Sequence, residues 1–171
     1  AVGHEAGAAV TTGVNNTIIG GLAGDALTTG ESNVAVGISA LSADTRGTNN
    51  VAVGRGALET QNFTSATASL NVAVGSLAGN AVTTGLYNAF LGGYAGDALT
   101  DADFNVALGY SALGTDTLGS HSVAIGHDAL VSQNFTTATN TYNTAVGSQA
   151  GVAVTTGVNN TLIGGLAGDA I

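Results

Sequence analysis

Asn33–Gly37 reads NVAVG, and variants of this pentapeptide recur along the whole chain. A glycine preceded by Val, Ile or Leu marks each repeat unit, and most units have a 17-residue length while two have a 21-residue length. The marker glycines are Gly3, Gly20, Gly37, Gly54, Gly75, Gly92, Gly109, Gly126, Gly147 and Gly164. The chain is therefore a repeat array, and we expect the array to continue beyond both of its ends.

Three 17-residue units and one 21-residue unit make a larger, 72-residue repeat. Residues 1–72 form the first copy, residues 73–144 the second, and residues 145–171 the beginning of a third. No change of composition divides the chain. We therefore interpret residues 1–171 as a single repeat array, a segment of a longer fibre.

The composition excludes several classes of protein. The 171 residues include 27 Gly and no Cys, so neither disulfides nor thiolate metal sites are possible. Eleven acidic residues against two Arg give a net charge of −9, which leaves no basic patch for nucleic acid or anionic lipid. No apolar run approaches the ~20 residues of a membrane-spanning helix. Low charge (8%) combined with 44% hydrophobic residues argues against disorder.

The length of the unit predicts the fold. A 17-residue unit is too short for the common helical repeats of ~33–47 residues, and the glycine and β-branched content disfavours helix. One turn of a flattened β-coil per unit fits, with one strand at NVAVG and a second extended segment near A-x-x-A-V/L-T. We expect an all-β parallel β-roll or β-solenoid whose 17- and 21-residue coils stack in register, ~4.8 Å apart.

Stacking in register would turn each fixed position of the unit into a ladder of like residues. The residue before the marker glycine is apolar in every unit, and a fixed Ala follows that glycine at the third position. A nearly invariant Asn precedes each strand and can donate hydrogen bonds along the stack. The ladder residues that we single out are Val36, Val53, Val74, Ala40, Ala57, Ala78, Ala95 and Asn50. We expect the Ala ladder to mark a place with room for only a methyl group.

Both faces of the predicted strand are apolar. Val34 and Val36 point to one face and Ala35 to the other, and the position of Ala35, which we take to face outward, holds Ile18, Phe90 or Leu162 in other units. One face can fill the coil interior, and the other needs a cover, most simply a symmetry-related chain. Where this position is bulky, two Gly follow at once, as at Gly92–Gly93, and the residue after the fixed Ala alternates in pairs between Gly and Leu. We predict that these differences compensate one another in core packing.

The two 21-residue units carry insertions, Gln61–Leu70 and Gln133–Tyr142, which we predict to project from the rod as polar loops. They hold our candidate contacts to a receptor, a glycan or a neighbouring rod: Asn62, Phe63, Thr64, Asn134, Phe135 and Thr136. The alternative is that each Phe folds back onto the rod.

The joint pattern NVAVGxxAL, NTAVGSQAGVAVTTGVNN and HSVAIGHDAL resembles the 17-residue repeats of phage tail fibres and bacterial surface proteins. It is also similar to the YadA-like head of trimeric autotransporter adhesins. The resemblance covers all ten units. It implies a left-handed parallel β-roll, three chains around one axis, and an extracellular adhesive or structural role on a virion or a cell surface.

We therefore expect a non-enzymatic structural and adhesive segment of an extracellular homotrimeric fibre, without cofactor, metal or catalytic residues. Its expected partners are two further copies and a host-cell glycan or receptor, with lateral or end-to-end self-association also open. One alternative is a building block of an extracellular filament that has no dedicated receptor. Ice binding is a remote alternative because Arg46 and Asp101 interrupt the Thr ladder, and a depolymerase is disfavoured because Asp101 and Asp103 alone are weak evidence for catalysis.

Overall fold

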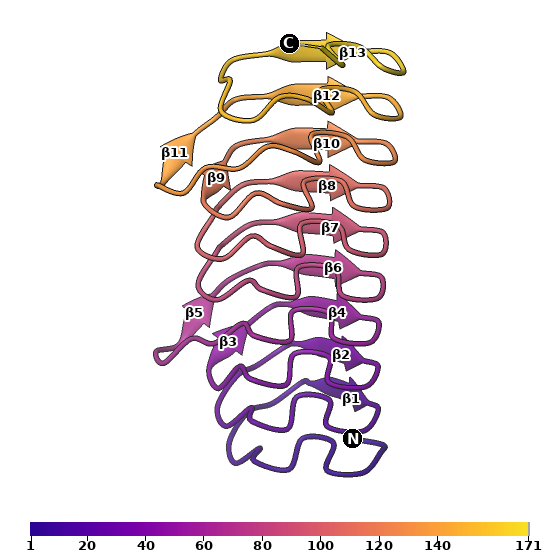
Figure 1. The fold of residues 1–171 in the computed structure, drawn as a ribbon. Helices are drawn as coiled ribbons and strands as arrows, with labels where there is room; N and C mark the ends of the chain where they lie inside the picture. The colour runs from indigo at the N-terminus through magenta and orange to yellow at the C-terminus, as the bar shows by residue number, and fades with distance from the viewer. Residues whose placement is uncertain (171) are drawn as a thin grey trace.

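Each repeat unit makes one turn of a rod, and successive turns stack along the rod axis (Figure 1). The structure is a computed structural model that describes residues 1–170. It is an all-β parallel solenoid of about nine turns with ~17-residue spacing, and no helix occurs within those residues. The two ends of the chain lie at opposite ends of the rod.

One three-residue strand from each turn joins a single nine-stranded parallel sheet. Its strands are β1 (Thr17–Ile19), β2 (Val34–Val36), β4 (Val51–Val53), β6 (Val72–Val74), β7 (Ala89–Leu91), β8 (Val106–Leu108), β10 (Val123–Ile125), β12 (Thr144–Val146) and β13 (Thr161–Ile163). Val2 adds an isolated parallel bridge to Ile19. Beside the 21-residue turns lie two small sheets, made of β3 (Gly47–Thr48) with β5 (Thr67–Ala68) and of β9 (Gly119–Ser120) with β11 (Thr139–Asn140).

The register of the large sheet confirms the predicted ladders. Each strand residue pairs with its repeat equivalent in the next turn, so Val36 pairs with Val53 and Val53 with Val74. In-register pairing places equivalent side chains one above another. The rise of ~4.8 Å per turn gives ten repeat units a length of ~45 Å.

The second segment of each turn, near A-x-x-A-V/L-T, is not extended, contrary to our expectation. The segment after the marker glycine forms turns, for example at residues 38–41. Backbone hydrogen bonds still join successive turns there, such as Leu41 N–H donating to the Ala57 carbonyl at 3.0 Å. The extended conformation is interrupted because Ser39 and Leu41 have φ angles of 56° and 53°, in the left-handed region.

Tight contacts between turns explain two of the repeated glycines. Gly37, a marker glycine, has φ +134°, and a Cβ built on it would lie 2.5 Å from the Gly54 carbonyl oxygen. Gly30, in the Thr-x-Gly segment, lies under the next turn, and its Cβ would come 2.6 Å from the Gly47 oxygen. No larger residue fits at Gly37 without moving the backbone of the neighbouring turn, whereas Ala102 occupies the equivalent of Gly30 in the second copy.

The interior of the coil contains the Ala ladder and, as a correction, the position that we took to face outward. Ala40, Ala57, Ala78 and Ala95 are fully buried, as predicted for a place that admits only a methyl group. Phe90 is also fully buried. Its repeat equivalents Ile18 and Leu162 belong to or pack against the same core. The side of each strand that faces outward is therefore the side of Val34 and Val36.

The predicted volume compensation is found around Phe90. A Cβ on Gly96 would lie 2.5 Å from the Phe90 ring, and one on Gly79 would lie 2.7 Å from it. Where the strand contributes Ala107 instead, the position equivalent to Gly96 holds the fully buried Leu113. Large and small side chains thus alternate between two positions of the coil so that the interior stays filled.

Most side chains of the Asn ladder connect adjacent turns with both ends of the amide. The Oδ1 atom of Asn33 accepts a hydrogen bond from the backbone N–H of Asn50 at 2.9 Å, and its Nδ2 donates to the Gly47 carbonyl at 2.9 Å. The same pattern recurs around Asn71 and Asn88. These buried side chains satisfy backbone groups that no strand pairing reaches.

Candidate interaction surfaces

The outer side of the nine-stranded sheet is an apolar surface that follows the rod. Two strand columns form it, one made of the first residue of each strand and one made of the last. The last-residue column is Val2, Ile19, Val36, Val53, Val74, Leu91, Leu108, Ile125, Val146 and Ile163. The first-residue column is Thr17, Val34, Val51, Val72, Ala89, Val106, Val123, Thr144 and Thr161. Neither column contains a charged residue.

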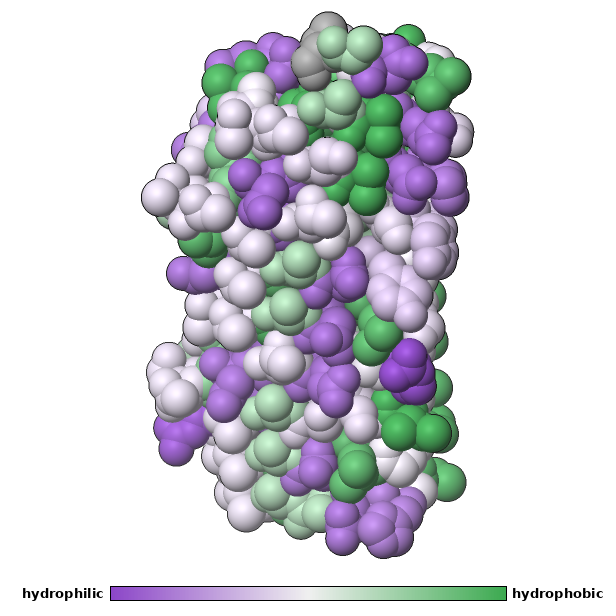
Figure 2. Space-filling model, viewed as in Figure 1, coloured by the Kyte–Doolittle hydropathy of each residue, from purple (hydrophilic) through white to green (hydrophobic). Residues whose placement is uncertain are grey.

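Many of these side chains remain accessible to solvent. Leu91 is 49% exposed and Leu108 43%, although both lie in the middle of the sheet. Contiguous apolar surface of this kind, left exposed to water, marks an interaction site. Figure 2 shows another aspect of the rod, where residues of similar hydropathy form narrow bands along the axis.

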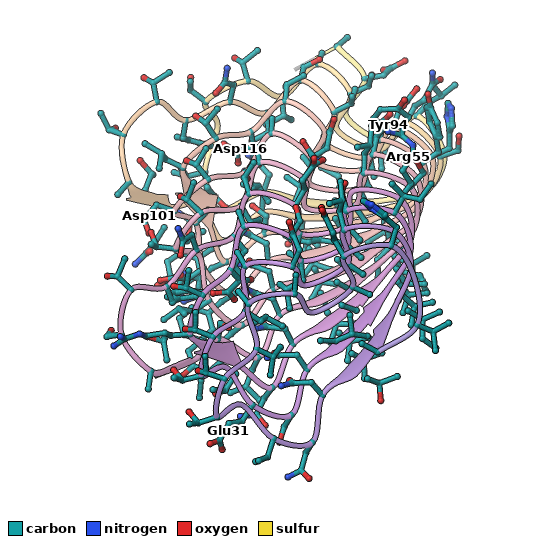
Figure 3. All side chains as sticks on the ribbon, turned by 90° about the horizontal axis from the view of Figure 1, so that it is seen from below. Glu31, Arg55, Tyr94, Asp101 and Asp116 are labelled. Carbon is teal, nitrogen blue, oxygen red and sulfur yellow. The ribbon has the colours of Figure 1, made fainter. Side chains whose placement is uncertain are left out.

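Aromatic side chains widen this surface in the second copy of the repeat. One flank column precedes the strands by two positions and stacks Tyr87, Phe104, His121 and Tyr142, with successive ring centroids 5.0–5.1 Å apart. On the other side of the strands, Tyr94 meets Tyr110 edge-to-face with ring centroids 5.7 Å apart, and Tyr110 stacks on His127 at 5.8 Å. Together with the two strand columns, these two flank columns make what we call the outward face. Figure 3 shows Tyr94 and Arg55 at the same outer corner of the coil.

The sequence-based candidate list missed these aromatic columns. The signal lay in a comparison of the two copies, because Tyr87, Phe104 and His121 replace polar residues at the equivalent places of the first copy. Those first-copy equivalents are Asn15, Ser32 and Asn49. All four tyrosines of the chain fall within residues 73–144.

The insertions project from the side of the rod, as predicted (Figure 1). Phe63 and Phe135, however, are only 6% and 7% exposed, which agrees with the alternative that each ring folds back. The candidate residues that remain exposed are Asn62, Thr64, Asn134 and Thr136. Among the candidate residues, only polar side chains therefore remain available for contact with a partner.

A buried carboxylate fixes each loop. Asp44 is fully buried, and its Oδ1 accepts hydrogen bonds from the backbone N–H groups of Gly47 and Phe63 at 2.9 and 3.1 Å. Its Oδ2 accepts a hydrogen bond from Gln61 Nε2 at 2.7 Å, and Gln61 in turn accepts one from Asn71.

Asp116 makes the equivalent contacts in the second copy, with Gly119, Phe135 and Gln133. Figure 3 places Asp116 within the ring of the coil. These two carboxylates, each in the 17-residue unit that precedes a 21-residue unit, thus hold the loop and carry no exposed chemistry.

Acidic groups elsewhere do not gather into a metal site. No cluster of three or more His, Cys, Asp or Glu side chains lies close enough to hold an ion anywhere in residues 1–170. Partial burial raises the pKa of Asp97, and a backbone hydrogen bond offsets part of that rise. Asp101 accepts a hydrogen bond from the Thr84 hydroxyl, and Asp103 accepts one from the backbone N–H of Leu86.

The described part of the chain contains no helix that could span a lipid bilayer. Comparison with protein-family models, with curated proteins and with solved structures found no match for this chain. The outward face, the loops and the composition are therefore the features that bear on its function.

Proposed function

We propose that the chain is a non-enzymatic structural and adhesive segment of an extracellular fibre in which three copies cover one another's outward faces. The single observation that carries the proposal is the uncharged apolar surface of the two strand columns, accessible along the whole rod. Exposed apolar surface of this extent is costly in water and is relieved when a second copy covers it.

The size of the surface suits a stable interface. At ~4.8 Å per turn the outward face is ~45 Å long, and four outward positions per turn make it ~20 Å wide. The resulting ~900 Å² per chain is comparable to the ~800 Å² that each partner contributes to a standard interface. A second copy is the occupant with the matching 17-residue period.

The number of three chains and a left-handed winding follow from the resemblance of the repeat to fibre and adhesin sequences. Within such a fibre the coils would act as a spacer, and the two loops would present polar groups once in each 72-residue copy. An extracellular location follows from the same resemblance.

The Thr side chains argue against ice binding. The hydroxyl groups of Thr11, Thr28, Thr83 and Thr100 each donate a hydrogen bond to a carbonyl of the next turn, at 3.0–3.2 Å. Hydroxyl groups whose donors are used within the protein offer less to a layer of ordered water.

The decisive experiment is the mass of the protein in solution, measured by sedimentation or light scattering. We expect the wild-type chain at micromolar concentration to have three times its 16.4 kDa mass. Leu108→Glu should reduce this mass to that of one chain, because it places a charge in the strand column. Thr12→Glu adds the same charge at an exposed corner away from the face and should leave the trimer intact.

A monomeric wild-type chain would overturn the proposal, and so would a trimer that withstands Leu108→Glu. Polymers much larger than three chains would favour the filament alternative. For the adhesive role, the wild-type trimer should bind host-type glycans or cells, and Thr64→Ala with Thr136→Ala should weaken that binding without changing the mass.

A further inference from the structure

The strand columns by themselves do not define how two copies align along the rod. The last-residue column is Val, Ile or Leu in all ten units, so a shift of one turn, ~4.8 Å, replaces each apolar contact by another except at the two ends of the rod. A four-turn shift superposes one 72-residue copy on the other and preserves the pattern even more closely. Regular patterns of this kind leave register weakly specified.

The aromatic flank columns break this regularity. They occur only in the second copy, where Tyr87, Phe104 and Tyr142 are 45%, 48% and 54% exposed. On the opposite flank Tyr94 is 37% and Tyr110 54% exposed. The first copy holds smaller or polar residues in the same places, including Asn15, Ser32 and Asn49 on one side and Arg55 on the other.

The rings are also ordered before any partner arrives. Tyr87 and Phe104 stack with an interplanar angle of 11°, and Tyr110 and His127 stack at 14°. Because the rings support one another along the axis, fixing them in an interface costs less conformational entropy than fixing isolated side chains. Large aromatic side chains that are partly exposed and preorganised are the usual anchors of protein interfaces.

We infer that the two aromatic flank columns set the register between copies of this chain, an inference that rests on the proposed assembly through the outward face. In register, the rings of one copy meet the rings of its neighbour. A four-turn shift instead brings them against Asn15, Ser32, Asn49 and Arg55, which loses ring contacts and desolvates polar groups. The repeat thus supplies the adhesive surface, and the departures from the repeat select one alignment.

The natural absence of cysteine allows a direct test. Val36 and Leu108 are equivalent positions of the strand column in the two copies. Chains carrying Val36→Cys and chains carrying Leu108→Cys, with different affinity tags, are co-assembled and treated with a short thiol-to-thiol cross-linker. In register the two thiols lie ~19 Å apart and do not react with each other. A four-turn shift brings them together, and mass spectrometry identifies the mixed product.

Two multiply substituted forms of the chain, which we call the stripped and the doubled background, make both copies alike and carry the same cysteine probes. In the stripped background the second copy receives the residues of the first: Tyr87→Asn, Tyr94→Leu, Phe104→Ser, Tyr110→Ile, His121→Asn, His127→Arg and Tyr142→Leu. In the doubled background the first copy receives those of the second: Asn15→Tyr, Leu22→Tyr, Ser32→Phe, Ile38→Tyr, Asn49→His, Arg55→His and Leu70→Tyr. Each coil already accepts these residues at the equivalent place, so both backgrounds should fold.

We expect no mixed product from the natural sequence. When both copies are alike, we expect a clear mixed product, at least tenfold more than the natural sequence gives. Trimers that keep a single register in either background would overturn the inference while leaving the proposed assembly intact. If the stripped chains are monomeric, the doubled background decides by the same criterion. A monomeric natural chain would instead contradict the proposed function.

Discussion

At the scale of single residues, the clearest feature is the place where the Asn ladder is interrupted. Asn50 is buried, and its Nδ2 has no hydrogen-bond partner among residues 1–170. Every intact ladder Asn donates to the carbonyl of a residue in the next turn, but the insertion that follows Asn50 changes the path of the chain there. In the second copy the equivalent residue is Ser122, the one exception in the ladder, and it pairs with Thr141.

This difference between the copies predicts that Asn50→Ser combined with Ser69→Thr, the pair found in the second copy, stabilises the protein. A buried unpaired donor costs about 1–3 kcal/mol. Removing it should raise Tm by about 2–4 °C per kcal/mol in a chain of this size, measured by calorimetry. The reciprocal change, Ser122→Asn with Thr141→Ser, should lower Tm. A fall in Tm with the first pair would show that the amide of Asn50 is satisfied.

At the scale of one coil, the size of the strand's inward side chain is coupled to the size of the side chain that follows the fixed Ala. Phe90→Ala should destabilise the fold by about 3–5 kcal/mol because it leaves a cavity that the neighbouring turns cannot close. Adding Gly79→Leu and Gly96→Leu should restore most of the loss. Leu58, Leu113 and their equivalents already occupy this position with φ near 50°, so the backbone accepts Leu there.

Chemical denaturation measures all three steps of this cycle. The control is Gly96→Leu in the presence of Phe90, which should be the least stable variant because the ring and the new side chain overlap. If the two Leu substitutions fail to improve the Phe90→Ala protein, the two positions are not coupled.

The loop of a 21-residue coil is a second element whose stability can be tested separately. Phe63→Ala should free the loop, because the ring is its main buried group beside the backbone bonds to Asp44. Limited proteolysis should then cut within residues 62–68 several times faster than in the natural chain, while the far-ultraviolet circular dichroism stays the same. Thr64→Ala, at an exposed position of the same loop, is the control and should change neither measurement.

At the scale of the whole molecule, charge opposes assembly while the apolar face favours it. Each chain carries −9, and the strand columns contain none of this charge. Repulsion between chains is therefore long-ranged and should be screened by salt. Lowering the ionic strength from about 0.15 M to about 0.01 M, which lengthens the screening distance from about 8 Å to about 30 Å, should weaken the assembly.

The measurement is the trimer-to-monomer midpoint in a dilution series followed by sedimentation. We expect this midpoint to shift to higher protein concentration at low salt. Glu31→Gln, which removes one exposed charge away from the strand columns, should reduce the salt dependence slightly. Stronger assembly at low salt would mean that attractive ion pairs, rather than apolar contact, hold the chains together.

The sequence alone determined the solenoid, the in-register ladders and the compensation around Phe90, because a strict period requires every turn to repeat the same backbone path. It predicted the direction of the loops but left open the burial of Phe63. Only the tertiary structure decided that Ile18 and Phe90 point into the coil, since alternation in a strand defines two faces without saying which one is inside.

The left-handed corners at Ser39 and Leu41 and the aromatic columns also depend on how turns stack. Neither is a property of one repeat read by itself. Each arises where equivalent residues of successive turns meet, and those distances in space exist only once the rod has formed.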